Sequence, residues 1–282
     1  MPRPIARSLA RARSRKANRK LPRAYRYSNA PQPPDGPILK YRLAMRQLVA
    51  RWWAKIGPEA LAAAKRIGKH TDEESDEADE VAVSLTDYAY VADEPAFAAR
   101  VKSTAESVGK HSDAQFKRIG IKLSESDPGV SKLVPGFRKE NVGLVKTMLR
   151  SEKTKLEALL RDGAGRRVES LAKDIEDRLG ITTRHAELIA RDQCLKLNAN
   201  ISHTRMQNAG VTEFVWSTSG DERVRESHAE LDGETFSFDD PPVTNDDGDT
   251  NLPGEDYQCR CVAFPVLAEL DDSEDDSAQA AE

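Results

Sequence analysis

The sequence predicts an α+β protein, in which a mainly helical body is followed by a small, loop-rich C-terminal module with short β-strands. Three observations lead to this fold class. Apolar residues recur with a helical period between Ile38 and Gly210, this period then stops, and short aromatic and β-branched runs follow, separated by Gly, Pro, Asn and Asp. We also expect a disordered basic arm at the N-terminus and an acidic tail at the C-terminus.

Changes in composition and periodicity divide the chain into parts. The 282 residues, 38% hydrophobic and 32% charged, suffice for one large domain or two small ones. The expected parts are a basic flexible arm (1–37), an N-terminal helical segment (38–67), an acidic linker (68–82), a helical body (83–210), the C-terminal module (211–267) and an acidic tail (268–282).

The cysteine content and the hydropathy narrow the class of protein. Three cysteines are too few for the disulfide framework of a small secreted domain, which favours a reducing compartment. The basic N-terminus lacks the apolar core of a signal peptide, and no stretch has the apolar length of a membrane span. We therefore expect a soluble protein with no membrane span.

The first 37 residues combine dense Arg and Lys with a proline-rich end. Basic side chains neutralise phosphates and release counterions, which gives salt-sensitive, sequence-independent affinity for nucleic acid. The alternative interpretation is a solvated tail. The candidate nucleic-acid contacts are Arg7, Arg11, Arg13, Arg15, Lys16, Arg19 and Lys20.

An amphipathic helix is predicted from Ile38, and Gly57-Pro58 should end it before a short Ala-rich helix. Its apolar positions are Ile38, Tyr41, Met45, Leu48, Val49, Trp52 and Ile56. Adjacent positions of a helix do not face the same core, so we expect one of Trp52 and Trp53 to contact another protein. The segment from Ile38 to Ile67 is therefore the candidate protein interface.

Turn signals punctuate the helical body. Helix ends or turns are expected at Pro128-Gly129, Pro135-Gly136, Gly163–Gly165 and Gly180. Thr182 or Thr183 should cap the helix that follows. Cys194 falls on the apolar side of that helix and is expected to be a core residue.

The C-terminal module contains three strand candidates, Phe214–Ser217, Thr235–Phe238 and Arg260–Phe264, and one helix or turn candidate, Arg223–Glu230. We expect Trp216 to anchor its core, and Asp232-Gly233 to form a tight hairpin turn. A loop-rich piece of this size buries little apolar surface. It therefore needs either a larger body to pack against or a metal staple.

His228, Cys259 and Cys261 are residue types that bind Zn²⁺, and a structural zinc ion is the one cofactor that the sequence suggests. Asp256 is the candidate fourth ligand, with Asp232 as the other choice. Three alternatives remain open. In the first, one cysteine packs inward, the other is partly exposed, and His228 hydrogen-bonds a loop backbone. The others are a Cys-His-Asp nucleophile and a metal-dependent nuclease centre, which would combine His228 with Asp221, Asp232 and the acidic cluster of Asp246, Asp247 and Asp249.

An ordered series of motifs runs through the second half of the chain. It comprises Ile189–Gln193, Ala209–Val211, Trp216–Ser219, Asp221–His228, Leu231–Gly233, Pro241-Pro242, Pro253-Gly254 and Cys259–Cys261. In this order and spacing they resemble the family of phage head-morphogenesis proteins related to the F protein of bacteriophage Mu, from about Asn141 onward. The chain departs from the pattern at two places, because many relatives carry Cys-x-x-Cys at Arg225–His228 and His-Pro-x-Cys at Asp256–Cys259.

The resemblance implies a minor head (capsid) protein of the virion, not an enzyme, which acts in head morphogenesis and is in the host cytoplasm during assembly. Its implied partners are the portal or major capsid protein and packaged double-stranded DNA, with no small-molecule substrate. The alternatives are a non-specific DNA-binding or ejected internal virion protein and, ranked below it, a metal-dependent hydrolase.

Overall fold

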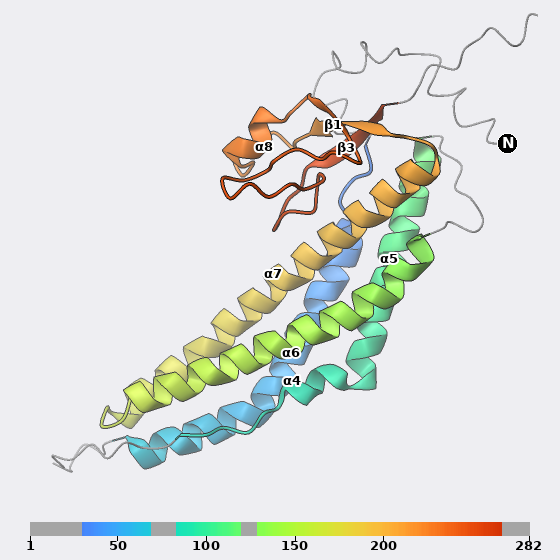
Figure 1. Cartoon of the computed structure of the whole chain (residues 1–282). Helices are drawn as coiled ribbons and strands as arrows, with labels where there is room; N and C mark the ends of the chain where they lie inside the picture. Colours follow the sequence, from blue (N-terminus) through green and yellow to red (C-terminus); the bar gives the residue numbers. More distant parts are fainter. Residues whose placement is uncertain (1–29, 69–82, 120–128, 267–282) are drawn as a thin grey trace, which may run out of the picture. The chain divides into compact units, whose positions relative to one another are not determined.

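A computed structural model describes residues 30–68, 83–119 and 129–266. Its elements (Figure 1) are α4 (Asp35–Ile67), the 3-10 helix η1 (Ala89–Asp93), α5 (Pro95–Arg118), α6 (Val130–Asp162), α7 (Val168–Asn208), β1 (Glu213–Ser217), α8 (Glu226–Glu230), β2 (Thr235–Ser237) and β3 (Val262–Val266). Long helices followed by a small sheet confirm the α+β class. The predicted acidic tail and nearly all of the acidic linker lie outside the described residues.

The described residues form two compact units, each assembled from separate chain segments. The helical unit contains Asp35–Glu106 and Val134–Gln193, and the sheet unit contains Ser107–Leu133 and the chain from Cys194, together with the segment that ends at Pro34. The division falls inside α5, α6 and α7, so each of these helices supplies residues to both units.

The core of the helical unit includes one buried polar connection. The Tyr41 hydroxyl donates to Oδ1 of Asn141 at 2.9 Å, and Nδ2 of Asn141 donates to the Phe137 carbonyl at 2.9 Å and to Oε1 of Gln193 at 3.2 Å. Tyr41 and Asn141 are both fully buried. Because the groups of the Asn141 amide have partners, the desolvation cost of burying it is offset, and α4, α6 and α7 are held in one register.

The predicted helix end at Gly57-Pro58 is wrong, since α4 continues to Ile67 with Pro58 inside it. Proline removes one backbone donor and usually breaks or kinks a helix. Here Ile56, Ala60, Ala63 and Ala64 are buried at helical spacing on both sides of the proline. Packing of this apolar face therefore keeps the segment helical against its local preference.

The turn signals at Pro135-Gly136 and Gly180 also fall inside helices, and the predicted cap at Thr182 or Thr183 is wrong, because α7 runs unbroken past both threonines. Each threonine hydroxyl donates to a carbonyl four residues earlier, Thr182 to Arg178 and Thr183 to Leu179, both at 2.8 Å. This internal bonding satisfies the hydroxyls without ending the helix.

Glu152 on α6 is the centre of a buried ion-pair group in the helical unit. Its carboxylate accepts hydrogen bonds from Arg178 of α7 at 2.7 Å and from Lys155 at 2.6 Å, while only 1% of the residue is exposed. Burial acts to raise the pKa of Glu152, but the hydrogen bonds and charges of Lys155 and Arg178 outweigh it, so this pKa lies below its ordinary value.

The sheet unit contains a three-stranded antiparallel sheet in the order β2-β1-β3. Phe214 pairs with Phe236 of β2, and Trp216 pairs with Ala263 of β3. All three predicted strands are confirmed, with shifts of one or two residues at their ends. The predicted helix shortens to α8.

Alternation along β1 gives the sheet two covered faces. One face belongs to an apolar cluster that also contains Phe116 of α5 and Met206 of α7; its other members are Ile119, Val211, Phe214, Trp216, Phe238, Cys259, Cys261 and Ala263. The other face joins Val215, Val262, Phe264 and Val266 to Ala30. Trp216 is fully buried, which confirms its predicted role as a core anchor.

We predict that Glu152→Gln lowers the free energy of unfolding by about 2 kcal/mol, because a hydrogen bond to a charged group contributes roughly 1.5–3 kcal/mol. Urea unfolding at pH 7 measures this change. Glu176→Gln, an exposed position on α7, is the matched control and should change stability by less than about 0.5 kcal/mol.

Wild type and the Glu152→Gln variant should also differ in how their stability depends on pH. A carboxylate with a lowered folded-state pKa stabilises the fold fully above its ordinary pKa of 4.5, and this contribution is lost as pH falls through the folded value. The stability difference between wild type and Glu152→Gln should therefore shrink in acid below pH 4.5. An undiminished difference at pH 3 would contradict the assignment of this charge.

Candidate metal centre

Two segments bring the candidate ligands of the sheet unit together. His228 lies on α8, while Cys259 and Cys261 lie in the extended chain that leads into β3. Residues two apart in an extended chain share a side, so the two sulfurs point the same way. The loop before them turns at Gly254 (φ 92) and at Gln258, a non-glycine residue with φ 56.

Contacts between the α8 region and this loop fix their approach. Arg260 donates to both carboxylate oxygens of Asp221, at 2.6 and 2.5 Å, and Arg225 donates to the Tyr257 carbonyl at 2.5 Å. Hydrogen bonding by Arg260 is the main reason why the pKa of Asp221 falls to about 2. A bidentate arginine–carboxylate pair restricts orientation as well as distance.

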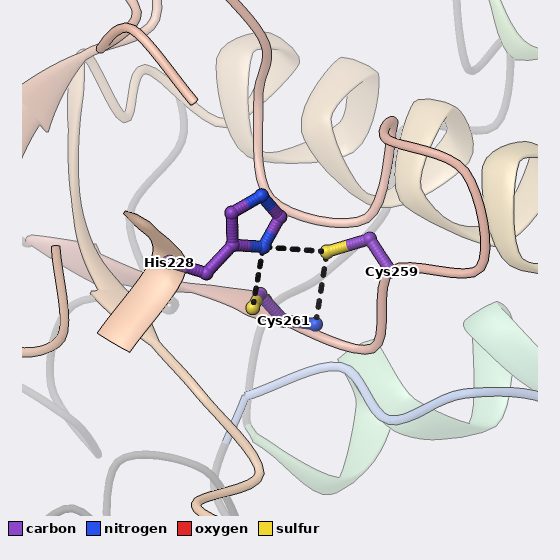
Figure 2. A group of neighbouring side chains, drawn as sticks. All are labelled: His228, Cys259 and Cys261. Carbon is purple, nitrogen blue, oxygen red and sulfur yellow. Dashed lines mark hydrogen bonds between the residues drawn. The ribbon is translucent and has the colours of Figure 1, made fainter. Parts of the chain in front are cut away.

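The imidazole of His228 faces both cysteines with one nitrogen. Its Nδ1 lies 3.5 Å from Sγ of Cys259 and 3.5 Å from Sγ of Cys261 (Figure 2). The three ligand atoms lie within 4.8 Å of one another. All three residues are buried, with 2% of His228, 5% of Cys259 and 6% of Cys261 exposed.

The other imidazole nitrogen contacts a carboxylate. Nε2 of His228 lies 2.9 Å from Oδ2 of Asp256, so the proton of a neutral ring is placed on Nε2 and the lone pair on Nδ1. The edge of the ring also packs against Trp216, with centroids 5.3 Å apart. Asp256, the expected fourth ligand, thus lies on the opposite side of the ring from the sulfurs.

Burial acts to lower the pKa of His228, but contacts with Cys259 and Asp256 outweigh it and raise the pKa above its ordinary value. The pKa of Cys259 is lowered, chiefly because the Cys261 thiol donates to it, with His228 adding to the effect. The pKa of Cys261 is raised for the same reason and by burial, while the N–H of Trp216 opposes that rise. One of the two thiols therefore ionises far more readily than the other.

The remaining site candidates lie elsewhere. Arg7, Arg11, Arg13, Arg15, Lys16, Arg19 and Lys20 are outside the described residues. Asp246, Asp247 and Asp249 are exposed in a turn, where Asn245 bonds Asp249. Asp232 accepts from the backbone N–H of Thr218 at 2.8 Å and from its hydroxyl at 3.2 Å. Gly233 has φ 90, although β1 and β2 are joined by residues 218–234 and not by a tight hairpin.

The two adjacent tryptophans of α4 differ in burial. Trp52 is 1% exposed and belongs to the core of the helical unit, whereas Trp53 is partly exposed. The Trp53 ring lies over Gly57, where an added Cβ would come within 3.0 Å of the indole. The larger exposed apolar side chains of α4 are Leu39 and Leu43, 67% and 54% exposed.

A polar face of α7 lines a small cavity beside the cysteines, and sequence reasoning missed it. Asn198, Ser202 and His203 line it together with Pro31, Pro33 and Gly254. Oδ1 of Asn198, Oγ of Ser202 and Nδ1 of His203 are buried without a hydrogen-bond partner. Burial lowers the pKa of His203 to about 4, against the effect of its bond to the Pro253 backbone. The spacing of Asn198 and Ser202, four residues apart, was the available signal.

Part of the chain is similar in sequence to a known protein family. Residues 154–264 match the family described as phage Mu protein F like protein. The similarity covers less than half of the chain. The match begins within α6 and ends in β3, so it includes α7, the sheet and the three clustered residues. It confirms the resemblance that the ordered motifs indicated.

A curated relative extends the comparison to another organism. An uncharacterized protein of Haemophilus influenzae is 38% identical over 158 residues, which cover 53% of this chain and 34% of the relative. The chain thus spans about a third of the length of the relative that it matches. No solved structure matches the chain. Across the part of the chain that the structure describes, no helix combines the length and the apolar character of a bilayer span.

We predict that the Gly254 turn is needed to seat the cysteine loop on α7. A Cβ at Gly254 would lie 2.8 Å from Cβ of Ala199, and its φ of 92 already disfavours other residues. Gly254→Ala should therefore lower the free energy of unfolding by about 2–5 kcal/mol, from backbone strain of about 1–2 and overpacking of about 1–3 kcal/mol.

Gly248→Ala is the matched control, because Gly248 also has a positive φ, of 85, but no atom lies within 4 Å of the added Cβ. It should show the strain alone, about 1–2 kcal/mol. Chemical denaturation of both variants measures the difference. Equal losses would show that the loop does not pack on Ala199.

Proposed function

We propose that this protein is a minor head protein of a bacteriophage, which acts in head morphogenesis by docking on the portal or major capsid protein, beside packaged DNA. The single observation that carries the proposal is the match of residues 154–264 to the phage Mu protein F-like family. A protein with this role works by binding its neighbours in the virion, and no catalytic step enters the proposal.

An apolar surface of the helical unit suits such docking. Leu39 and Leu43, one turn apart on α4, are 67% and 54% exposed, and Leu188 on α7 is 44% exposed. Arg42 of α4 pairs with Glu187 of α7 at 2.5 Å, which brings the two leucine-bearing segments together. Exposed apolar residues with a polar rim are typical of protein-binding surfaces. Of the two candidate tryptophans, Trp52 is buried and Trp53 is partly exposed. We propose that Leu39 and Leu43, together with Trp53, contact the partner.

The basic composition of the first residues favours DNA as a second partner. Met1 to Arg26 contains Arg and Lys side chains and no acidic residue. We propose that Arg7, Arg11, Arg13, Arg15, Lys16, Arg19 and Lys20 contact phosphates of the packaged genome. A protein that is ejected with the genome, or that binds DNA without docking, is the competing function.

The proposal is tested by the composition of purified particles. Mass spectrometry of virions and of empty proheads should detect this protein in both, because a docked assembly protein is present before packaging. Absence from both kinds of particle would refute a structural role, while presence in DNA-filled particles alone would favour the DNA-binding alternative.

We predict that the double variant Leu39→Gln with Leu43→Gln folds normally but enters proheads at a strongly reduced level. Exposed substitutions change stability by about 0.5 kcal/mol or less, whereas loss of interface anchors weakens binding by more than about 1 kcal/mol. Leu144→Gln, at an exposed position of α6, is the matched control and should be incorporated normally. Normal incorporation of the double variant would remove this surface from the docking proposal.

The contribution of the basic segment is measured by salt dependence. Binding to double-stranded DNA should fall steeply with ionic strength, with a logarithmic slope of about −0.9 per neutralised phosphate. Deletion of residues 1–27 should flatten this slope. An unchanged slope after the deletion would show that DNA binding, if present, uses another surface.

A further inference from the structure

We propose that His228, Cys259 and Cys261 hold a structural zinc ion, with Nδ1 of His228 and the two sulfurs as ligands, a water molecule as the fourth ligand, and Asp256 as a positioning residue outside the coordination shell. The three ligand atoms are buried and lie within 4.8 Å of one another. The proposal rests on this geometry and is independent of any role in the phage head.

The separations between the candidate ligands fit a tetrahedral zinc ion. Zn–N bonds of about 2.0–2.1 Å and Zn–S bonds of about 2.3 Å place nitrogen and sulfur about 3.6 Å apart in a tetrahedron. Nδ1 of His228 lies 3.5 Å from each of the two sulfurs (Figure 2). A small closing movement of side chains is all that coordination requires.

Both sulfurs approach the same nitrogen of the imidazole. Asp256 binds Nε2 of His228, so Nδ1 presents one lone pair, and one lone pair accepts one S–H group. Two sulfurs nevertheless approach it at the same distance. A metal ion accounts for both approaches, because it takes the lone pair and both thiolates at once.

The surroundings match those of metal-bound ligands. Asp256, His228 and the proposed ion form a carboxylate–histidine–metal series, which fixes the ring tautomer and makes Nδ1 a better donor to the metal. The backbone N–H of Cys261 donates to Sγ of Cys259 at 3.4 Å. The indole Nε1 of Trp216, which belongs to the same core cluster as both cysteines, is buried without a hydrogen-bond partner. N–H groups directed at sulfur favour the thiolate form that binds zinc.

Water is the best fourth ligand because the neighbouring carboxylates are already engaged. Asp256 is on the far side of the imidazole, and Asp232 accepts from the N–H and hydroxyl of Thr218. Among the described residues, the metal-ligand cluster that includes His228 contains no further His, Cys, Asp or Glu. The small cavity that Cys259 and Cys261 line leaves room for a water molecule.

The burial of the ligands indicates a staple and not a catalyst. Three protein ligands and a water molecule are also the ligand set of catalytic zinc sites. A catalytic ion, however, must admit a substrate to its open position, and here only 2–6% of each ligand residue is exposed. The ion would join α8 to the segment that leads into β3. Between these two segments the chain contains only loops and the short strand β2. The ion would thus join the parts of the sheet unit that have the least regular structure.

The first experiment is metal analysis of the full-length protein, purified under reducing conditions without chelators. We expect one zinc per chain, and replacement by Co²⁺ should give the visible bands of a tetrahedral site together with thiolate-to-cobalt charge transfer. Removal of the metal should lower the Tm, and zinc should restore it. A folded wild-type protein that contains no zinc and gives no cobalt spectrum overturns the proposal.

Variants separate the ligands from the other cysteine. Cys259→Ser and Cys261→Ser should each lose the charge-transfer band or reduce the metal content, while Cys194→Ala should keep both. Cys194 is buried in α7 and is not part of the cluster, so it controls for the loss of a buried thiol. Full retention of zinc in either serine variant would exclude that sulfur as a ligand and overturn the three-ligand site.

Asp256→Asn tests the positioning role. Loss of a carboxylate behind a metal-bound histidine typically weakens affinity 10–100-fold, without changing the ligands themselves. We therefore expect the cobalt spectrum of saturated Asp256→Asn to keep its shape while zinc binding weakens by that factor. Asp247→Asn, at an exposed position, should bind as wild type does. Unchanged affinity in Asp256→Asn, or loss of the tetrahedral spectrum at saturation, would refute the assigned role.

Discussion

The burial of one sheet face against the ends of two helices is the interaction on which the sheet unit depends. Its strands are three to five residues long, too short to enclose a core of their own. Trp216 and Phe214 instead pack with Phe116 of α5 and Met206 of α7. Full burial of each such side chain contributes about 1.5–3 kcal/mol to the stability of the fold. This cluster therefore supplies most of the stabilisation that the loops and short strands cannot provide by themselves.

The position of the candidate ligands follows from that burial. Trp216 fixes one side of His228 by an edge contact, while Cys259 and Cys261 belong to the same apolar cluster. Asp256 and the Arg260–Asp221 pair then define the remaining orientations. The site is thus a polar corner of a hydrophobic core. In such a place a charged ring or thiolate is costly unless each atom has a partner.

The sequence was informative where residue type and packing agree. Helical periodicity predicted the long helices, and the short aromatic and β-branched runs after Gly210 predicted the three strands. It failed where a local signal competes with burial: Pro58 remains inside α4, and Thr182 remains inside α7. In both places an apolar face continues past the signal, and its contacts come from residues distant in the chain. Local turn propensity contains no information about such tertiary contacts, so it predicts a helix end where the packed structure has none.

The candidate site shows the same limit. Residue types singled out His228, Cys259 and Cys261, but only the fold shows that Asp256 faces the opposite nitrogen of the ring. Likewise, two adjacent tryptophans signalled that one must leave the core, yet the choice depends on Gly57, which gives Trp53 a place along its own helix. The polar face of Asn198 and Ser202 had the spacing of a helix face, but its cavity is closed by Pro31 and Pro33 from the other end of the sequence.

The interleaved make-up of the sheet unit has a consequence for how the chain folds during synthesis. Ala30 and Phe116 leave the ribosome long before β3, the strand that completes the two apolar clusters to which they belong. The nascent chain must hold these apolar positions uncovered until β3 has emerged. Such late, long-range closure slows folding and prolongs exposure to aggregation and to chaperones. Neither unit corresponds to a contiguous stretch of the gene, so a truncated product cannot complete the sheet unit.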